Sequence, residues 1–578
     1  MPNISALKLG ANALMAHRAA IETTGHNIAN IATPGYSRQR VEFNAMSPLR
    51  MTFGYLGRGA DVAAVVRIAD GFLEAQVRDA ASSSAEASVV AEVYRNLEAA
   101  FNELSDYDIS TAVADFFDAL QDLAANVENE AARSAALQQG LTLRDLISDL
   151  HSDLAALRAR FDEQIVGLAD QVNALASQVA ALNTEIVRAE AGLPQGSAAD
   201  LRDRRGQLMR ELSELVETRS IEQPGGAVNV TVSGAPLVFL GESFDLVTEL
   251  ESSRGQAVHT VRLSEGGVPV ASGSGKLGGL IGARDEILTS YMDDLDEMVA
   301  TFVWHFNRVH AGGVGERGLS GVRSQYAVAN PADALSQADI AFDGPAGIFE
   351  IRNGSFTIYV RDEVSGTVSA RNVSVDLDGI GTDTALLNSV TGNDLVSLIN
   401  AAAPELTASV DSRGYLDIRS GSPNTTFHFG GDTSGVLATL GVNSFFTGFS
   451  AADMDVNSAI VADEALIATG HSLAAGDNTN VMELAALRTA EIFAGGTRPL
   501  EDFHQGVVSR LATEAAKSFT RASTRDSLLL RLENEREQIS GVSLDEELTK
   551  LIQFQRTYQG AARFVGVVND LLGTLLEI

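Results

Sequence analysis

The 578-residue chain contains no cysteine, few aromatic residues and almost no lysine. Without cysteine there can be no disulfide bond and no thiolate metal site. Aromatic residues make up 6% of the chain, with a single tryptophan at Trp304, and lysine occurs only at Lys8, Lys276, Lys517 and Lys550. The length predicts three or more domains, because a single hydrophobic core rarely grows this large.

Positive charge is also scarce. The chain carries 76 acidic residues against 42 lysines and arginines, which gives a net charge of −34. Phosphate backbones and anionic membrane surfaces both attract basic proteins, so we predict neither nucleic acid nor membrane as a partner. Residues 1–5 lack the basic and apolar pattern of a signal peptide, and we expect no 18-residue apolar run. A cleaved signal peptide and a membrane span are therefore not predicted.

No pattern for catalysis or metal binding stands out. His305 and His310 are five residues apart, which does not place them on one helical face, and no HExxH motif occurs. The glycine-rich stretch at 54–59 lacks the strand-to-helix context of a dinucleotide loop. The acidic residues at 293–297 could in principle serve glycoside hydrolysis, but the apolar residues between them favour a solvated helical face. We predict no enzyme activity, no catalytic residue, no cofactor and no metal site.

The first 30 residues have the apolar pattern of a coiled-coil helix. Apolar positions recur at spacings of three and four, which is narrower than the stripe of a globular surface helix. Thr33, Pro34, Gly35 and Tyr36 then end the helix, since proline cannot continue it and glycine supplies the turn. Interrupted at Arg18 and Gly25, this first seam consists of Ile4, Leu7, Ala11, Leu14, Ile21 and Ile28.

The C-terminal segment repeats this pattern. Gly566 and Gly573 are one heptad apart and share a face that another backbone could approach, although each costs about 1 kcal/mol relative to alanine. The two terminal helices could pair within one chain, or they could gain order only against neighbouring copies. With Gln555 and Asn569 in the same register, this second seam consists of Leu544, Leu548, Leu551, Tyr558, Ala562, Val565, Leu572 and Leu576.

A third and longer seam predicts one long helix between residues 140 and 190. Its spacings are again three and four, with one step of four and four at Phe161 that relaxes the heptad supercoil. The seam runs through Leu143, Ile147, Leu150, Leu154, Leu157, Phe161, Ile165, Leu168, Val172, Leu175, Val179, Leu182 and Ile186.

The β-like segments lie in the middle of the chain. Residues 45–75 are predicted to be irregular or β, residues 226–272 alternate like short strands, and 346–450 form a second β-rich stretch with a helix near 384–402. We therefore predict a multidomain α+β fold with an elongated coiled-coil or bundle core made from both chain halves. Its domains are a terminal coiled-coil domain (1–45 and 541–578), a mainly helical rod domain (46–345 and 460–540) and a β-rich outward-facing insert (346–459).

The two ends of the chain also carry recognisable motifs. The segment GHNIANIATPGYSRQ at 25–39 resembles the N-terminal signature of flagellar rod, hook and hook-associated proteins. The segments ISGVSLDEE at 539–547 and QFQRTYQ at 553–559 resemble their C-terminal signature. Each signature lies at its proper end of the chain, which makes the pair specific. Asn27 and Asn30 fall where the helix ends, and short amides there can bond to nearby backbone groups.

Interior segments resemble the hook-associated protein 1 family in particular. They are DLRDRRGQL at 200–208 leading into GGAVNV at 225–230, GKLGGL at 275–280 followed by Arg284, Asp285 and Asn307, and GDNTN at 476–480. The resemblance covers nearly the whole chain except about 330–460. His26 departs from the pattern, because the family usually has a small polar residue there, and this puts a side-chain amide role at that position in doubt.

The resemblance implies a structural subunit of the extracellular bacterial flagellum at the hook–filament junction, exported unfolded by the type III apparatus. It implies as partners further copies in a helical ring, the hook protein, hook-associated protein 3 and a cytosolic export chaperone. Asn27, Asn30, Thr33, Pro34, Gly35, Tyr36 and the two terminal seams are the predicted assembly interface. The alternatives are another axial protein, such as hook protein or hook-associated protein 3, or an adhesin or enzymatic module carried on the flagellum.

Overall fold

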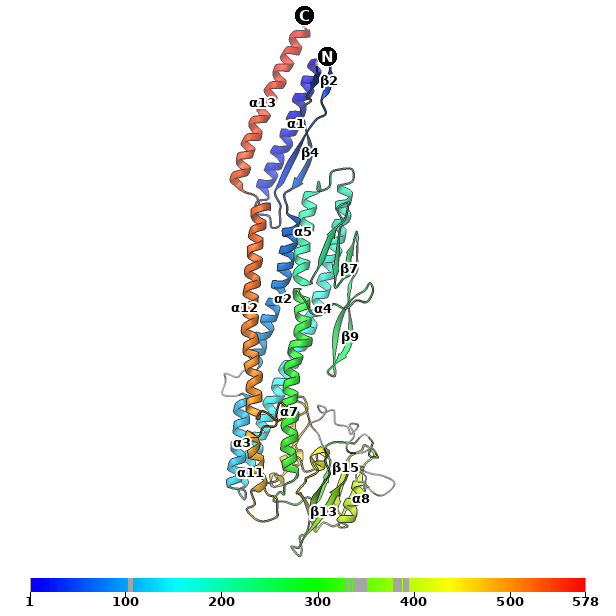
Figure 1. Ribbon diagram of the computed structural model, residues 1–578, viewed down its shortest axis with the longest axis vertical. Coiled ribbons are helices and arrows are strands. Elements are labelled where there is room, and N and C mark those ends of the chain that lie inside the picture. The colour runs from blue at the N-terminus through cyan, green and yellow to red at the C-terminus, as the bar shows by residue number, and fades with distance from the viewer. Residues whose placement is uncertain are drawn as a thin grey trace. The chain divides into compact units, whose positions relative to one another are not determined.

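The computed structural model describes residues 2–52, 54–101, 108–328, 330–332, 335, 351–377, 387 and 394–576. The side chains of Ile4 and Leu576, both predicted at the interface, lie outside the described side chains. The protein is mixed α+β: long helices from both ends of the chain pack together, and small antiparallel sheets lie between them in sequence (Figure 1). The predicted fold class is confirmed.

The chain divides into two compact units. Unit 1 comprises Met1–Tyr94, Arg158–Glu286 and Ala515–Ile578, and unit 2 comprises Arg95–Leu157 and Ile287–Glu514. Three long helices contribute residues to both units. They are α2 (Gly71–Phe101), α4 (Glu130–Ala189) and α12 (Leu500–Ser540). The three-domain division predicted from the sequence stays a prediction.

The two terminal helices of the chain lie side by side in unit 1 (Figure 1). Gly10 marks a close approach, because a Cβ atom there would collide with the side chain of Val565 and lie 3.2 Å from Phe564. The two helices are α1 (Pro2–Ala29) and α13 (Leu544–Leu576).

The segment after α1 forms two antiparallel β pairs. The longer pair has a bulge between Glu42 and Phe43, and both of its strands contact α1. The segment predicted to be irregular or β was 45–75; its described residues are so up to residue 70, whereas 71–75 already belong to α2. The strands are β1 (Gln39–Ala45) paired with β4 (Ala60–Arg67), and β2 (Leu49–Met51) paired with β3 (Gly54–Leu56).

The remainder of unit 1 combines helices with further antiparallel strands. One sheet has the order β5-β6-β7-β8, and β9 and β10 form a hairpin of their own. On β6, Val228, Val230 and Val232 alternate into the core, as their period of two predicts. The elements are α5 (Ala199–Leu215), β5 (Arg219–Glu222), β6 (Val228–Val232), β7 (Ala235–Phe239), β8 (Glu242–Ser243), β9 (Leu246–Ser253), β10 (Gln256–Leu263), α6 (Gly275–Gly282) and the π-helical turn η1 (Ala283–Ile287).

Helix α4 contains the long predicted seam, and most of its seam residues are buried. Leu168 and Leu175 are only half-buried, because burial moves by one residue to Ala169 and Ala176. Burial returns to the predicted seam at Val172, Val179 and Ile186, so the difference is confined to these two positions.

Among the described helices, only α4 is long and apolar enough to cross a membrane by length and composition. Polar residues interrupt it throughout, so it contains no continuous run of 18 apolar residues, as expected. The core helix of a protein that spans no membrane passes the same test, so a single such helix is weak evidence. The absence of a membrane partner stays a prediction.

Phenylalanine side chains fill the core of the helical part of unit 2. The ring centroid of Phe116 lies 5.4 Å from that of Phe306 and 5.7 Å from that of Phe446. Gly140 of α4 lets the backbone approach this cluster, because a Cβ atom there would lie 3.0 Å from Phe445. The helices of this part are α3 (Ile109–Ala125), α7 (Leu288–Ala311), α10 (Ser458–Ala462), α11 (Thr479–Ala486) and the short turns η2 (Glu464–Leu466) and η3 (Leu487–Thr489).

The β-rich part of unit 2 contains two three-stranded antiparallel sheets, ordered β11-β15-β14 and β13-β12-β16. Phe356, Ile358 and Val360 alternate into its core. The helix predicted near 384–402 is described only as α8 (Leu395–Ala402), since 388–393 lie outside the described residues. The other elements are β11 (Gly321–Arg323), β12 (Gly354–Asp362), β13 (Val368–Val375), β14 (Leu406–Val410), β15 (Leu416–Ser420), β16 (Thr425–Gly430), α9 (Val436–Leu440), β17 (Phe446–Thr447) and β18 (Asp455–Val456).

Candidate functional site

The N-terminal signature forms the end of α1 and the turn into β1. The His26 carbonyl accepts from the Asn30 backbone N–H at 3.1 Å and also from the Asn30 side-chain amide at 3.0 Å, so Asn30 closes the last turn of the helix twice. Gly35 has φ of +77°, a conformation that strongly favours glycine. The chain therefore reverses within a few residues, and β1 returns beside the helix from which it came.

Asn27 is the centre of this turn, and its side chain is buried. Its Oδ1 accepts from the Gln39 backbone N–H at 2.9 Å and from the Tyr36 hydroxyl at 2.8 Å. Its Nδ2 donates to the Gln39 carbonyl at 2.9 Å and to Oε2 of Glu547 at 2.9 Å. One amide thus satisfies its hydrogen-bonding capacity while joining the N-terminal signature to the C-terminal one.

Glu547 lies in the first turn of α13 and is only 1% exposed. Its second carboxylate oxygen pairs with Nζ of Lys550 at 2.9 Å, so the buried charge has a partner on each side. Nearby, the Arg38 backbone N–H donates to the Ser540 carbonyl at 2.8 Å, and its guanidinium pairs with Glu546 at 2.7 Å. These contacts hold the break between α12 and α13 against the turn after α1.

The start of α5 supplies a third group of contacts. Asp203 accepts from the Ser37 backbone N–H at 2.9 Å and pairs with Arg67 of β4 at 3.1 Å. Asp200 accepts from the Gln39 side-chain amide at 2.6 Å. The motif at 200–208 therefore meets the N-terminal signature directly. We call this meeting point of residues 26–39, 540–550 and 200–210 the terminal junction.

The electrostatics of the terminal junction favour fixed hydrogen bonds. Burial raises the pKa of Tyr36, and the carboxylates of Asp200, Asp203 and Glu547 raise it further, so the phenol keeps its proton. That proton is donated to Asn27, so the 3.1 Å contact between the Tyr36 hydroxyl and Nδ1 of His26 requires the imidazole to donate. At the position where the signature usually has a small polar side chain, His26 therefore donates a hydrogen bond from its ring nitrogen Nδ1 to Tyr36.

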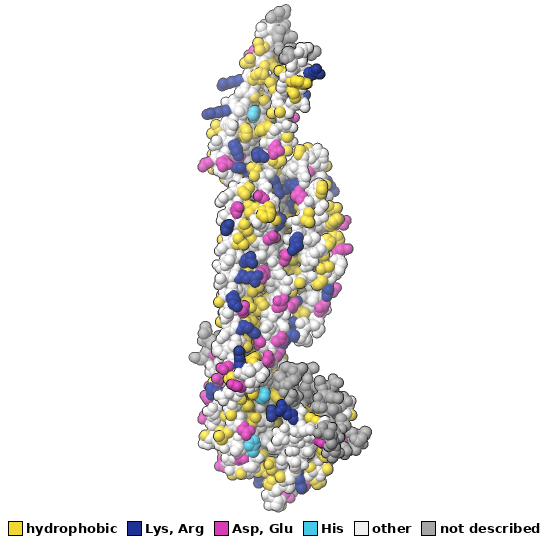
Figure 2. Space-filling model, in the orientation of Figure 1, with side chains coloured by type: hydrophobic (Ala, Val, Ile, Leu, Met, Phe, Trp, Pro, Cys, Tyr) yellow, Lys and Arg dark blue, Asp and Glu magenta, His cyan; other side chains and the backbone are white. Residues whose placement is uncertain are grey.

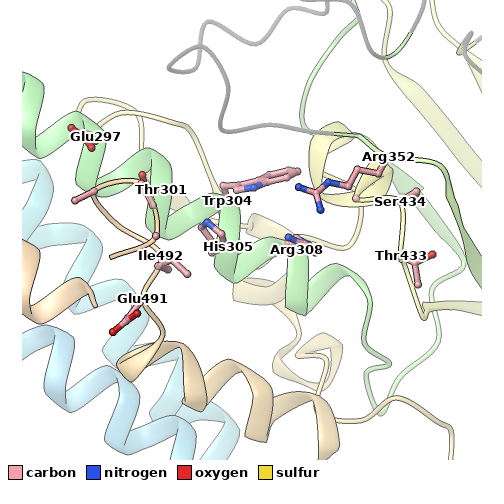
Figure 3. A pocket seen from close by; sticks show the side chains of 14 residues that line it. Glu297, Thr301, Trp304, His305, Arg308, Arg352, Thr433, Ser434, Glu491 and Ile492 are labelled. Carbon is pink, nitrogen blue, oxygen red and sulfur yellow. The ribbon is translucent and has the colours of Figure 1, made fainter. Parts of the chain in front are cut away.

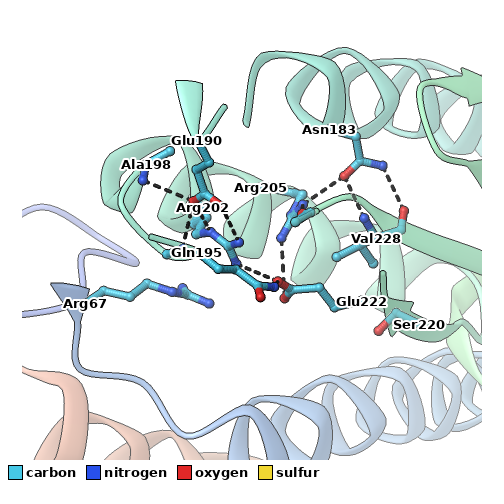
Figure 4. A network of polar contacts seen from close by, with 12 residues as sticks. Arg67, Asn183, Glu190, Gln195, Ala198, Arg202, Arg205, Ser220, Glu222 and Val228 are labelled. Atoms are coloured by element: carbon cyan, nitrogen blue, oxygen red, sulfur yellow. Dashed lines mark hydrogen bonds and ion pairs between the residues drawn. The ribbon is translucent and has the colours of Figure 1, made fainter. Parts of the chain in front are cut away.

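Behind the terminal junction, a buried polar network fastens α5 to α4 and to the sheet (Figure 4). Arg202 makes a two-pronged contact with Glu190 at 2.7 and 2.9 Å and also reaches Glu222 at 2.8 Å. Arg205 donates to Asn183 at 2.9 Å and to the Gly226 carbonyl at 2.6 Å. These bonds therefore fix the start of α5, which carries Asp200 and Asp203, to both α4 and the sheet.

The pKa values in this network follow from burial and pairing. Burial acts to raise the pKa of Glu190, but hydrogen bonds from Arg202 and from the backbone of Ala198 and Gly196 outweigh it and lower the pKa to about 2. Burial lowers the pKa of Arg205 to about 10. All of these groups keep their charges at neutral pH, so the network is a set of ion pairs rather than an acid–base site.

The predicted interface residues fall into two groups. Asn27, Asn30 and Tyr36 enter the terminal junction, whereas Thr33 and Pro34 are exposed and Gly35 lies against Arg210. The seam residues lie along the paired α1 and α13. Half-buried seam residues are Leu14, Ile21, Ile28, Leu551, Val565 and Leu572, and exposed ones are Leu7, Ala11, Leu544, Leu548, Tyr558 and Ala562.

Sequence reasoning singled out Asn27 and Tyr36 but not the other polar residues of the terminal junction. Ser37, Arg38, Gln39 and Glu547 all lie inside the two signature segments, and Asp203 lies inside the interior motif. The signal was therefore present as a motif, but periodicity does not report which polar residues face one another. In the described ranges no group of three or more histidine, aspartate or glutamate side chains could hold a metal ion.

Comparison with known families agrees with this arrangement. The profile of flagella basal body rod proteins matches residues 7–36, and that of the flagellar basal body rod FlgEFG protein C-terminal region matches 535–578. These are the two segments that the terminal junction brings together. Paired terminal helices closed by these signatures define a flagellar axial protein.

The interior identifies the kind of axial protein. The profile of the flagellar hook-associated protein FlgK helical domain matches residues 94–323. Flagellar hook-associated protein 1 of Escherichia coli strain K12 is 26% identical over 589 residues, covering 98% of each chain. That of Bacillus subtilis strain 168 is 24% identical, covering 99% of this chain and 97% of the relative.

The chain belongs to the flagellar hook-associated protein 1 (FlgK) family, whose members are structural proteins of the flagellum and not enzymes. The flagellar hook junction protein FlgK from Burkholderia pseudomallei has a solved structure that is 14% identical, with a TM-score of 0.48. The match covers 80% of this chain and 100% of that one.

Proposed function

We propose that copies of this chain form a ring at the hook–filament junction of the extracellular flagellum by polymerising through α1 and α13. The supporting observation is that α13 keeps large apolar side chains at the surface although it already packs on α1. Ile552 is 52% exposed, Val567 59% and Leu571 57%. Figure 2 shows apolar side chains at the surface of the terminal helices.

The free energy available from these side chains is considerable. Burying one large aliphatic side chain fully contributes about 1.5–3 kcal/mol, so several on one helix suffice to drive association of helices between copies. Gly560, Gly566 and Gly573 leave open space, because a Cβ atom at any of them would meet nothing within 4 Å. The predicted interface residues of α1 and α13 are therefore proposed to meet neighbouring subunits.

The proposed partners are further copies of the chain, the hook protein, hook-associated protein 3 and a cytosolic chaperone bound to the C-terminal region before export. Export is proposed to pass unfolded through the type III apparatus without a cleaved signal peptide. The lack of cysteine suits a chain that passes unfolded to an oxidising exterior. The exposed apolar residues of α13 give a chaperone a surface to cover.

A deletion strain tests the proposal. Without this gene, cells should build hooks that carry no filament and should shed flagellin into the medium. Complementation with the full chain should restore filaments, whereas a chain lacking 1–45 and 541–578 should not. Filaments restored by the chain that lacks both ends would refute assembly through α1 and α13.

A further inference from the structure

Unit 2 contains a cavity of about 510 Å³ that the assembly function does not use. One face of α7 forms one wall, the segments around Arg352 and 433–435 form a second, and the loop at 491–496 forms a third (Figure 3). The volume lies within the usual range for binding sites of small molecules and short peptides. All of its lining residues belong to the same unit.

Charge is separated along this cavity. Glu297 and Glu491 lie toward one end, and Arg308 and Arg352 lie toward the other, with His305 between them (Figure 3). Glu297 and Arg308 are eleven residues apart on α7, which corresponds to about 16 Å along the helix axis. Burial lowers the pKa of His305 to about 4, so the middle of the wall is neutral at physiological pH.

Three of these charged groups have no partner in the described part of the chain. The side chains of Glu297, Glu491 and Arg308 make no hydrogen bond or ion pair with any described residue. Many charged side chains elsewhere in unit 2 are paired. Unpaired charges gathered on one concave surface are the polar groups that orient a ligand in a binding site.

The loop that forms the third wall is held in a strained shape. Ala494 has φ of +50°, a conformation that costs a non-glycine residue free energy, and Gly495 and Gly496 follow with φ of +71° and +83°. Such strain is retained where the surrounding structure fixes it, and it concentrates at ligand sites. The loop is closed by antiparallel pairing of Phe493 with Arg498, which holds Ala494 at the cavity.

We propose that this cavity binds an extended peptide segment of four to five residues with a cationic group at one end and a carboxylate at the other. At about 3.3 Å per residue, a segment of this length spans the distance between the two charged ends. Its cationic group would face Glu297 and Glu491, and its carboxylate would face Arg308 and Arg352. Each contact is a charge-assisted hydrogen bond.

The same walls do not suit a saccharide. Trp304 is only 4% exposed and offers no open ring face on which a sugar could stack. The hydroxyls of Thr433 and Ser434 are already bonded, the first to the Ser355 backbone at 3.0 Å and the second to Asp432 at 2.7 Å. Recognition therefore depends on the acidic and the basic end of the cavity, and a zwitterionic peptide carries a complementary charge for each.

The only tryptophan of the chain lines this cavity, so its fluorescence reports on the site in the full-length protein. The probe is the blocked peptide acetyl-Lys-Gly-Gly-Gly-Glu-amide, titrated against tryptophan emission. Comparison peptides carry glutamine at both ends or glutamate at both ends. We expect saturable binding of the zwitterionic peptide only. Equal binding of either comparison peptide, or no saturable change with the zwitterionic one, would overturn the proposal.

Single substitutions locate the binding to this cavity. Arg308→Gln and Glu491→Gln should each weaken binding about tenfold or more, because each removes a bond to a charged group. Arg413→Gln is the matched control: that arginine is exposed, lies in the same unit and lines no part of this cavity. Circular dichroism checks that the variants fold. Unchanged affinity in both cavity variants, or an equal loss in the control, would place the binding elsewhere.

Discussion

Replacing Asn27 by aspartate should loosen the terminal junction without changing the size of the side chain. The new oxygen atom would take the place of Nδ2, which donates to the Gln39 carbonyl and to Glu547, each at 2.9 Å. Both acceptors would then face an acceptor, and two carboxylates would meet in a buried site. The bonds that Oδ1 accepts from Tyr36 and from the Gln39 N–H can persist.

The size of the effect follows from the two lost bonds. A bond to a neutral carbonyl contributes about 1 kcal/mol and one to a charged group about 1.5–3 kcal/mol. The junction should therefore lose about 3 kcal/mol of local stability, and repulsion between the carboxylates adds to this loss. Because 1.4 kcal/mol corresponds to about a factor of ten, local opening should become roughly 100-fold more frequent.

Amide hydrogen exchange measures this opening directly in the full chain. The reporters are the Arg38 amide, bonded to the Ser540 carbonyl at 2.8 Å, and the Glu547 amide, bonded to the Ser543 carbonyl at 3.0 Å. Both should exchange roughly 100-fold faster in Asn27→Asp. Asn30→Asp is the control, since the Asn30 side chain bonds only to neighbouring residues, the His26 carbonyl and the Thr33 hydroxyl, and not across the junction. Its effect on the reporters should be small.

A second substitution should reverse part of the loss. Adding Glu547→Gln to Asn27→Asp supplies an amide donor opposite the new carboxylate, so the bond across the junction can form in the opposite sense. The double variant should exchange more slowly than Asn27→Asp alone, a coupling that a double-mutant cycle quantifies. Unchanged exchange in Asn27→Asp, or a double variant no better protected than that single one, would refute the role given to this amide.

Of three further predictions, two concern helix packing and one concerns pH. Gly10→Ala should weaken the α1–α13 contact, because its methyl group would collide with Val565. Gly573→Ala should raise the helicity of isolated chains, measured by circular dichroism, and should impair polymerisation, measured by sedimentation. His310 is buried, its Nδ1 donates to the Asn443 carbonyl at 2.8 Å, and burial lowers its pKa to about 4 from the usual 6.5. The unfolded state therefore binds the proton first, so His310 alone should lower the unfolding free energy by roughly 3 kcal/mol as pH drops from about 6.5 to 4. Urea unfolding of His310→Asn should show a shallower pH dependence, and an equal slope would contradict this assignment.

The long helices could be predicted from the sequence because their signal is local and periodic. The seam of α4 identified most of the residues that the fold buries, and its error at Leu168 and Leu175 has a geometric cause. A helical seam can continue from Ile165 by a step of three or of four residues, and periodicity alone does not decide between Leu168 and Ala169.

The terminal junction could be predicted only as a pair of motifs. Asn27 and Glu547 are 520 positions apart, and no spacing rule connects residues at that distance. The sequence predicted that the amides of Asn27 and Asn30 both bond to nearby backbone groups at the helix end. Only the Asn30 amide bonds to the adjacent helical turn. The acidic residues at 293–297 were likewise predicted to be solvated, yet Asp294 pairs with Arg510 and Asp296 accepts from the Ala451 backbone at 2.9 Å. Polar partners are set by tertiary packing, which periodicity does not record.

The contact between Asn27 and Glu547 also constrains the order in which the chain can fold. A chain that emerges from its N-terminal end presents Asn27 early, but the carboxylate that completes its bonding emerges more than five hundred residues later. Closing so long a loop is slow compared with forming local helices. Until the last helix arrives, the buried amide has water in place of its partner, so the first segment to be made is the last to reach its final structure.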